Sequence, residues 1–114
     1  MNAKIRPFKE GEMNMIRHML AEEVSWDLIP GHMWNGLRSY VYGGQPPGQF
    51  LRAVLENDFM GAAGYADDYN GARLREWAQV MMQVPSACKG SREAVEMWLA
   101  RWELTRAEAG YAQG

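Results

Sequence analysis

The spacing of the apolar residues constrains this chain more than any other feature. Between proline and glycine breaks, apolar side chains recur with the helical period, and no segment keeps the strict apolar–polar alternation of a half-buried strand. The breaks lie at Pro7, Gly11, residues 29–31, residues 43–48, Pro85 and Gly90. Because helices with one apolar stripe bury it against one another, the pattern predicts an all-α fold, a single compact domain of five or six short helices.

The breaks divide the chain into helical segments. We expect helices over residues 12–26, 32–42, 47–57, 58–67, 69–83 and from Arg92 onward. Ser91 stands immediately before the last of these, and its hydroxyl is placed to accept a hydrogen bond from a free backbone N–H, so it is the predicted N-cap. The sequence leaves open whether residues 58–83 form one helix or two.

The segment over residues 47–57 is the most apolar and is expected at the centre of the core. Its stripe consists of Phe50, Leu51, Val54 and Leu55. Trp77 and Trp98 lie on the stripes of their own segments, so both are expected to pack against it. The apolar residues that the segment over 58–67 would present to the core are Phe59, Ala62, Ala63 and Ala66.

The two ends of the chain are expected to lie outside the domain. Residues 1–10 carry several basic side chains and few apolar anchors, which predicts a flexible N-terminal arm. Residues 110–114 follow the last helical pattern and are expected to form a frayed C-terminal tail. The single all-α domain would then span residues 11–109.

Composition excludes several classes of protein. The chain has 114 residues, of which 47% are hydrophobic, and a formal net charge of −2. No apolar run approaches the ~20 residues that a membrane span requires, and the charge argues against nucleic-acid binding over the whole surface. Cys88 is the only cysteine, so no intrachain disulfide forms, and a cytoplasmic setting is expected.

The sequence contains no clear constellation for catalysis or metal binding. The only histidines are His18 and His32, which do not share a zinc-binding motif. Asp58, Asp67 and Asp68 form an acidic cluster, which is more typical of helix caps and turns than of a cation site. Cys88 is interpreted as a packed, inert thiol. We therefore expect no catalytic residues, no metal and no cofactor.

A set of short motifs is similar to a known group of proteins. These motifs are Ile29-Pro30-x-His32-Met33, Gly36-Leu37-x-x-Tyr40-Val41, Pro46-Pro47-Gly48-x-Phe50-Leu51-x-Ala53-Val54-Leu55-x-Asn57-Asp58, Ala66-Asp67-x-x-Asn70, Pro85-x-x-Cys88-x-Gly90-Ser91 and Val95-x-x-Trp98. Over about residues 29–99 the chain resembles a family of small proteins encoded in phages and prophages. The resemblance implies a genetic setting and brings no activity with it.

Three functions remain after this search. The leading hypothesis is a non-enzymatic phage or prophage accessory protein that binds a host protein in the host cytoplasm, including counter-defence of the anti-CRISPR kind. The alternative is a small DNA-binding transcriptional regulator that uses Arg73 and Arg75 of the segment over 69–83. A minor enzyme using Cys88 or the acidic cluster is the third. Self-association into a homo-oligomer stays open.

Two groups of polar and aromatic residues are candidates for a binding surface. Trp34 departs from the apolar stripe of its segment, which predicts an exposed indole beside Arg38 and Tyr42. Tyr65 departs from its stripe in the same way and lies close to Asp67 and Asp68. In the alternative interpretation, Trp34 packs against the N-terminal helix. The candidate binding residues are Trp34, Arg38, Tyr42, Tyr65, Asp67 and Asp68.

Overall fold

A computed structural model describes residues 5–113, with side chains as far as Gly110, and confirms the all-α single domain. Within these residues there are seven α-helices and no strand. They are α1 (Glu10–His18), α2 (Trp34–Val41), α3 (Gln49–Leu55), α4 (Phe59–Tyr65), α5 (Asp68–Gly71), α6 (Leu74–Met81) and α7 (Arg92–Gln113). A π turn (Met19–Glu23) extends α1, and single 3₁₀ turns occur at Trp26–Leu28, Gly31–Met33 and Ser86–Cys88.

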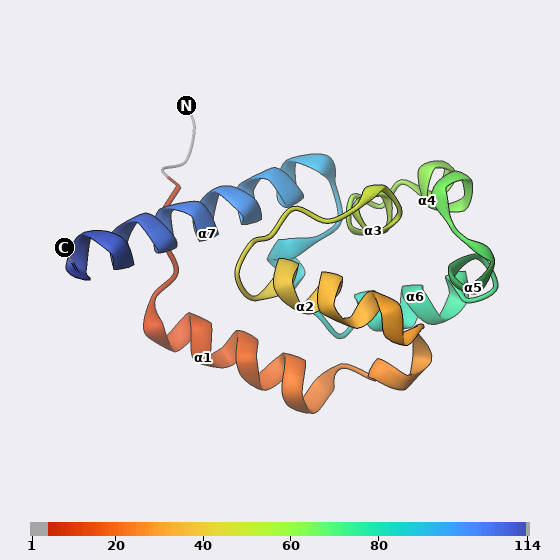
Figure 1. Cartoon of the computed structure of the whole chain (residues 1–114), viewed down its shortest axis with the longest axis horizontal. Coiled ribbons are helices and arrows are strands. Elements are labelled where there is room, and N and C mark those ends of the chain that lie inside the picture. Colours follow the sequence, from red (N-terminus) through yellow and green to blue (C-terminus); the bar gives the residue numbers. More distant parts are fainter. Residues whose placement is uncertain (1–4, 114) are drawn as a thin grey trace.

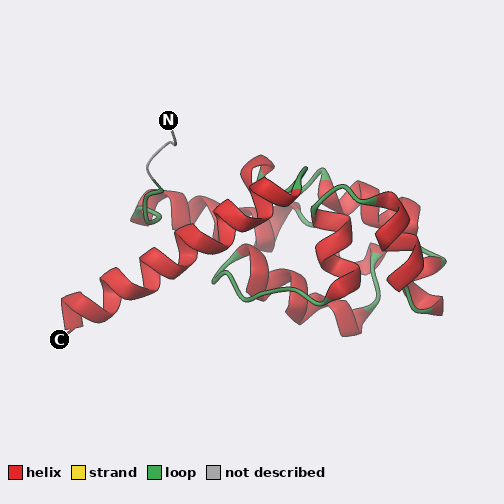
Figure 2. Ribbon diagram, turned by 90° about the horizontal axis from the view of Figure 1, so that it is seen from above, coloured by secondary structure: helices red, strands yellow, loops and turns green. Residues whose placement is uncertain are grey.

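The helices are arranged around a central layer. α2, α3 and α6 lie in the middle of the molecule, α1 runs along one edge, and α4 and α5 form the end opposite the C-terminus (Figure 1). α7 crosses the body with its N-terminal half, and its C-terminal half projects beyond the other helices (Figure 2). The projecting half therefore has few neighbours to cover it.

The predicted core is confirmed. Of the expected stripe, Phe50, Leu51 and Leu55 are buried and Val54 is half-buried. Phe50 packs edge-on against Trp77, with 5.5 Å between ring centroids. Trp98 belongs to the same core, and its indole N–H is shared between the carbonyl oxygens of Tyr40 and Val41 at 3.2 Å each. α3 is covered mainly by α4, and it also contacts α6, through Phe50 and Trp77, and α7.

The segment over residues 58–83 forms three helices. Asn57 ends α3 in the left-handed region, at φ 62°. The carboxylate of Asp58 then accepts a hydrogen bond from the N–H of Gly61 at 2.9 Å, and that of Asp67 accepts one from Asn70 at 2.7 Å. Each aspartate caps a new helix, because it satisfies a backbone N–H that lacks a partner in the first turn.

The expectation of a flexible arm over residues 1–10 is wrong for its described part. Phe8 is buried, and its ring lies 4.8 Å from that of Trp98 and 4.6 Å from that of Trp102. The phenyl ring therefore belongs to the hydrophobic core together with the two indoles of α7. Residues 1–4 lie outside the described residues.

Both ends of α7 can be compared with the sequence. The Oγ of Ser91 accepts a hydrogen bond from the N–H of Ala94 at 3.0 Å, so the predicted cap is confirmed. The expected frayed tail from Gly110 is instead helical as far as Gln113. Alanine, glutamate and arginine dominate the end of this helix, and their helix propensity outweighs the cost of one glycine, about 1 kcal/mol.

Candidate functional site

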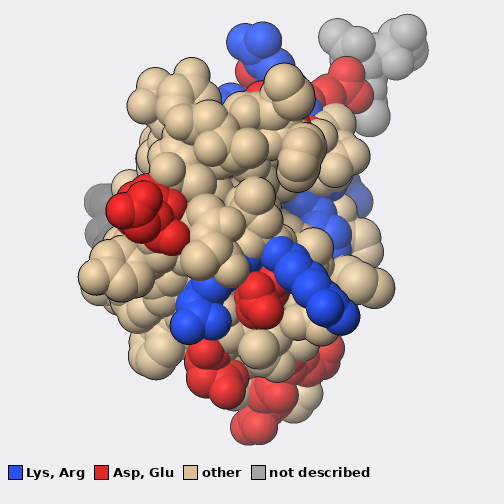
Figure 3. Space-filling model, turned by 90° about the vertical axis from the view of Figure 1, so that its right-hand side faces the viewer, with Lys and Arg blue, Asp and Glu red and all other residues tan. Residues whose placement is uncertain are grey.

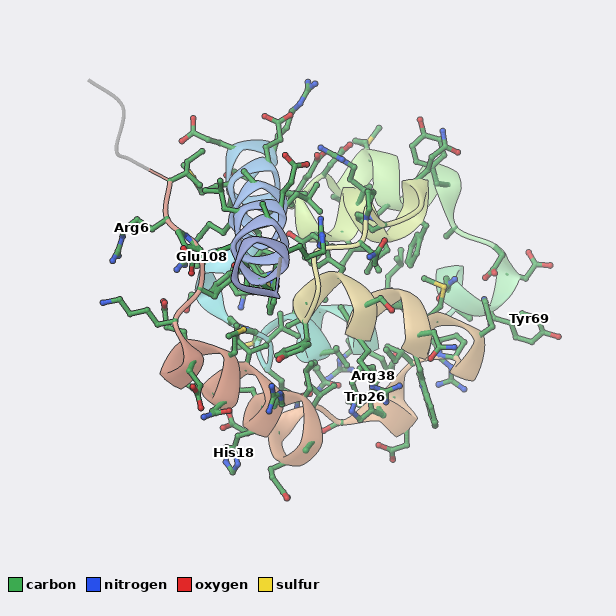
Figure 4. The ribbon with its side chains drawn as sticks, turned by 60° about the vertical axis from the view of Figure 1, so that its left-hand side comes forward. Arg6, His18, Trp26, Arg38, Tyr69 and Glu108 are labelled. Carbon is green, nitrogen blue, oxygen red and sulfur yellow. The ribbon has the colours of Figure 1, made fainter. Side chains whose placement is uncertain are left out.

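The six candidate binding residues fall into two separate groups. Arg38 and Tyr42 lie at α2 and face α1, and Trp34 begins α2. Tyr65, Asp67 and Asp68 lie at the end of α4 and in α5. Figure 4 shows Arg38 beside Trp26 below α2, whereas Tyr69 of α5 points outward at the far edge of the molecule.

The first group is built on Trp26. The guanidinium carbon of Arg38 lies 4.8 Å from the centre of the Trp26 ring, which is a cation–π contact. The ring of Trp34 lies 6.2 Å from that of Trp26, and its indole N–H donates to the carbonyl oxygen of Ile29 at 3.1 Å. Trp34 is therefore held against the turn that follows the first helical segment and stays about one-third exposed, at 37%.

Tyr42 is fixed by a second set of contacts. Arg17 of α1 donates to its hydroxyl at 2.6 Å and lies 5.0 Å from the centre of its ring, and the ring packs at 4.8 Å against Trp102. Arg17, Trp26, Arg38 and Tyr42 line an open hollow of about 600 Å³. Because each of these side chains already has internal contacts, this group serves to hold α1 against α2.

The second group is joined by a histidine. The carboxylate of Asp67 caps α5 and lies 3.0 Å from the Nε2 of His32 in the turn before α2. The N–H of Asn70, followed by His32, holds the pKa of Asp67 below its usual value of 3.8. The ring of His32 also faces that of Tyr69, with 6.3 Å between centroids. No sequence pattern signals this contact, because His32 and Asp67 are 35 residues apart.

Four strongly exposed apolar or aromatic side chains lie within residues 59–69, the stretch that includes Tyr65, Asp67 and Asp68. Phe59 is 70% exposed, Met60 79%, Tyr65 55% and Tyr69 73%. We call these four residues the α4–α5 patch. They lie at one end of the molecule, where much of the surface is uncharged and acidic and basic side chains are spread over the lower half and the edges of the view (Figure 3).

Only Tyr65 of this patch was among the candidate residues. Phe59 was expected on the buried stripe of its helix, but Ala62 is the residue of α4 that is buried. α4 lies at the end of the molecule, so its first turn extends past the edge of the core. Of the other residues expected to face the core, Ala66 is half-buried and Ala63 is exposed, so the expected stripe of this segment is wrong except at Ala62 and, in part, at Ala66. The helical period carries no information about where the core ends.

Cys88 and the acidic cluster have structural explanations. Cys88 is fully buried, and this burial raises the pKa of its thiol to about 12. Asp58 and Asp67 act as helix caps, as the sequence indicated. Within residues 5–113 no three His, Cys, Asp or Glu side chains are grouped so that they could hold a metal ion.

Comparison with known proteins yields no relative for this chain: no family model matches it, and no significant match is found among curated proteins or solved structures. None of the helices in the described part of the chain combines the length and the apolar character needed to cross a bilayer.

Proposed function

We propose that this protein is a non-enzymatic accessory protein that acts by binding another protein through the α4–α5 patch. The observation that carries the proposal is the exposure of four large apolar or aromatic side chains within residues 59–69. Side chains of this kind are enriched at the centres of protein interfaces, where truncation of one often costs 2 kcal/mol or more.

The cost of leaving such a surface in water supports the same proposal. Burying apolar surface contributes roughly 25 cal/mol per Å². A partner that covers Phe59 and Met60 removes their surface from water, so the complex is stabilised relative to the isolated domain. Large apolar side chains that stay exposed at one end of a small domain commonly mark an interaction site. Asp68 and the His32–Asp67 pair border the patch and supply polar groups that would orient a partner.

The motifs of residues 29–99, interpreted as a resemblance to phage and prophage proteins, lead us to propose a host protein as the partner, in the cytoplasm of the host cell; the comparisons themselves return no such relative. A small protein without a catalytic constellation can act there by occupying a surface of a defence complex, a polymerase or a regulator. Counter-defence of the anti-CRISPR kind is one such role.

The alternative, a DNA-binding regulator, would use the exposed residues at the start of α6. Arg73 and Arg75 lie there, but Glu76 adjoins them, and the net charge of the chain is −2. A recognition helix usually gathers several basic and amide side chains on one exposed face. The experiment below separates this alternative from protein binding.

The test is capture of partners from a bacterial host lysate, with and without nuclease, by the tagged protein and two variants. Met60→Glu combined with Tyr69→Glu changes the patch. Met15→Glu is the matched control, because Met15 is 60% exposed on α1, away from the patch. We expect a nuclease-resistant protein partner that the control retains and the patch variant loses, with melting temperatures unchanged. Retention by the patch variant, or loss of the partner after nuclease treatment, would contradict the proposal.

A further inference from the structure

A second apolar feature lies beside the α4–α5 patch. An open hollow of about 510 Å³ is lined by residues of α3, α4, α6 and the turn before α7. Its walls are apolar, and they include Val54, Ala62, Leu74, Trp77, Ala78 and Met81. A hollow of this size and character holds one face of a helix.

The charges at the rim of this hollow are mainly positive. Arg75 and Lys89 line it, and none of the ion pairs within residues 5–113 involves either of them. The ammonium of Lys89 donates one hydrogen bond, to the carbonyl oxygen of Val84 at 3.2 Å, and keeps its charge at the rim. Asp58 also lines it, but its carboxylate accepts the capping hydrogen bond from Gly61. The hollow is therefore suited to an apolar helix face with carboxylates beside it.

The chain itself carries such a helix face. The inner face of α7 packs in the core through Val95, Trp98 and Trp102, which are buried. The opposite, outer face carries Met97, Ala100 and Leu104 at helical spacing. Met97 and Leu104 are exposed. We call these three residues the α7 outer stripe.

Carboxylates lie on both sides of the α7 outer stripe. Glu103 and Glu108 are exposed, and neither forms an ion pair within the described residues. Because the C-terminal half of α7 projects from the body, this face is accessible to another molecule (Figures 1 and 2). From Met97 to Glu108 the helix is about 17 Å long.

We infer that the α7 outer stripe of one copy docks into the hollow of a second copy. Met97 and Leu104 contact its apolar wall, and Glu103 and Glu108 lie near Arg75 and Lys89 at its rim. The contact joins two different surfaces, so it closes a dimer when two copies exchange it reciprocally and extends into a longer assembly when they do not. The inference does not depend on the α4–α5 patch. Phe59 belongs to that patch and also lines the hollow.

The test is sedimentation velocity from about 10 µM to about 1 mM, a range suited to a small interface. The wild-type protein should sediment faster as its concentration rises, and added salt should weaken this association. Two charge-reversed variants, Arg75→Glu with Lys89→Glu and Glu103→Lys with Glu108→Lys, should each remain monomeric over the whole range. Met15→Glu is the control, because Met15 is exposed on α1 and lines neither surface, and it should associate as the wild type does.

Mixing the two charge-reversed variants provides the decisive comparison. The acidic rim of one should bind the basic stripe of the other, so the mixture should recover the faster sedimentation that each variant alone has lost. Recovery also shows that both variants are folded. The inference is overturned if the wild-type protein stays monomeric up to the highest concentration, if the variants associate as it does, or if mixing gives no recovery. If the wild-type protein stays monomeric, the hollow does not bind a second copy and must bind a different partner.

Discussion

The hydroxyl of Tyr40 donates a hydrogen bond of 2.7 Å to the backbone carbonyl oxygen of Cys88. Both residues are fully buried, and the bond joins the last turn of α2 to the turn that leads into α7. Burial raises the pKa of the Tyr40 hydroxyl well above its usual value, so it stays protonated and remains a donor. This bond helps to set where α7 begins relative to the central helices.

Removing the Tyr40 hydroxyl should destabilise the protein. Tyr40→Phe leaves the carbonyl of Cys88 without its partner in a buried site, and the expected loss is about 1–3 kcal/mol in the free energy of unfolding by urea. Tyr65→Phe is the matched control, since Tyr65 is exposed, and should change stability by less than about 0.5 kcal/mol. Equal effects of the two substitutions would contradict the role assigned to the bond.

The thiol of Cys88 should be unreactive in the folded protein. Its pKa of about 12 keeps it protonated at pH 8, and its burial excludes a reagent. We expect labelling by a disulfide reagent to be slow in buffer and to accelerate sharply in urea above the unfolding transition. Labelling in buffer at the rate of a free cysteine would instead favour the interpretation of Cys88 as a nucleophile.

Truncation of Leu51 should identify the centre of the core. Leu51→Ala removes a buried side chain from α3, and the expected loss is about 2–5 kcal/mol. Val54→Ala on the same helix removes a half-buried side chain and should cost less. Urea unfolding of both variants measures the difference. A loss below about 0.5 kcal/mol for Leu51→Ala would show that the core is centred elsewhere.

Much of the fold could be predicted because it follows from local patterns. The stripe on α3 and the cap at Ser91 are both determined by residues within a few positions of one another. Phe8 could not be placed in this way, because an isolated aromatic residue has no periodicity. Its position depends on Trp98 and Trp102, more than eighty residues along the chain, and only the assembled domain brings them together.

The candidate site was only partly predictable for the same reason. Tyr65, Asp67 and Asp68 are neighbours in sequence, so their grouping was evident. The contact between His32 and Asp67 joins two segments that are 35 residues apart. The exposure of Phe59 depends on where α4 meets the edge of the core, which residue spacing alone does not specify.

Glu12 should make the stability of the protein sensitive to acid. Its carboxylate accepts hydrogen bonds from the N–H of Lys9 at 3.0 Å and from Arg101 at 3.1 and 3.2 Å. The Lys9 N–H, followed by Arg101, lowers its pKa below the usual value of 4.5. Since the folded state holds this group with the lower pKa, its contribution is fully present above about pH 4.5 and is lost as the pH falls through the folded pKa.

The measurement is the free energy of unfolding from about pH 6 to about pH 3 for the wild type and Glu12→Gln. The wild type should be the more stable at pH 6, and its advantage should shrink as the carboxylate is protonated. Glu23→Gln is the control, because that side chain is exposed and has no ion pair in the described structure. A difference between wild type and Glu12→Gln that stays constant with pH would contradict this account.

Site-specific photocrosslinking tests the central claim, that the α4–α5 patch binds another protein, most directly. A photoreactive phenylalanine derivative is placed at Tyr69 in one protein and at Met15, exposed on α1, in another, and both are irradiated in a nuclease-treated host lysate. The account predicts a crosslink from position 69 to one defined protein other than this chain, and none to that protein from position 15. Equal crosslinking from both positions, or none from position 69, would contradict it.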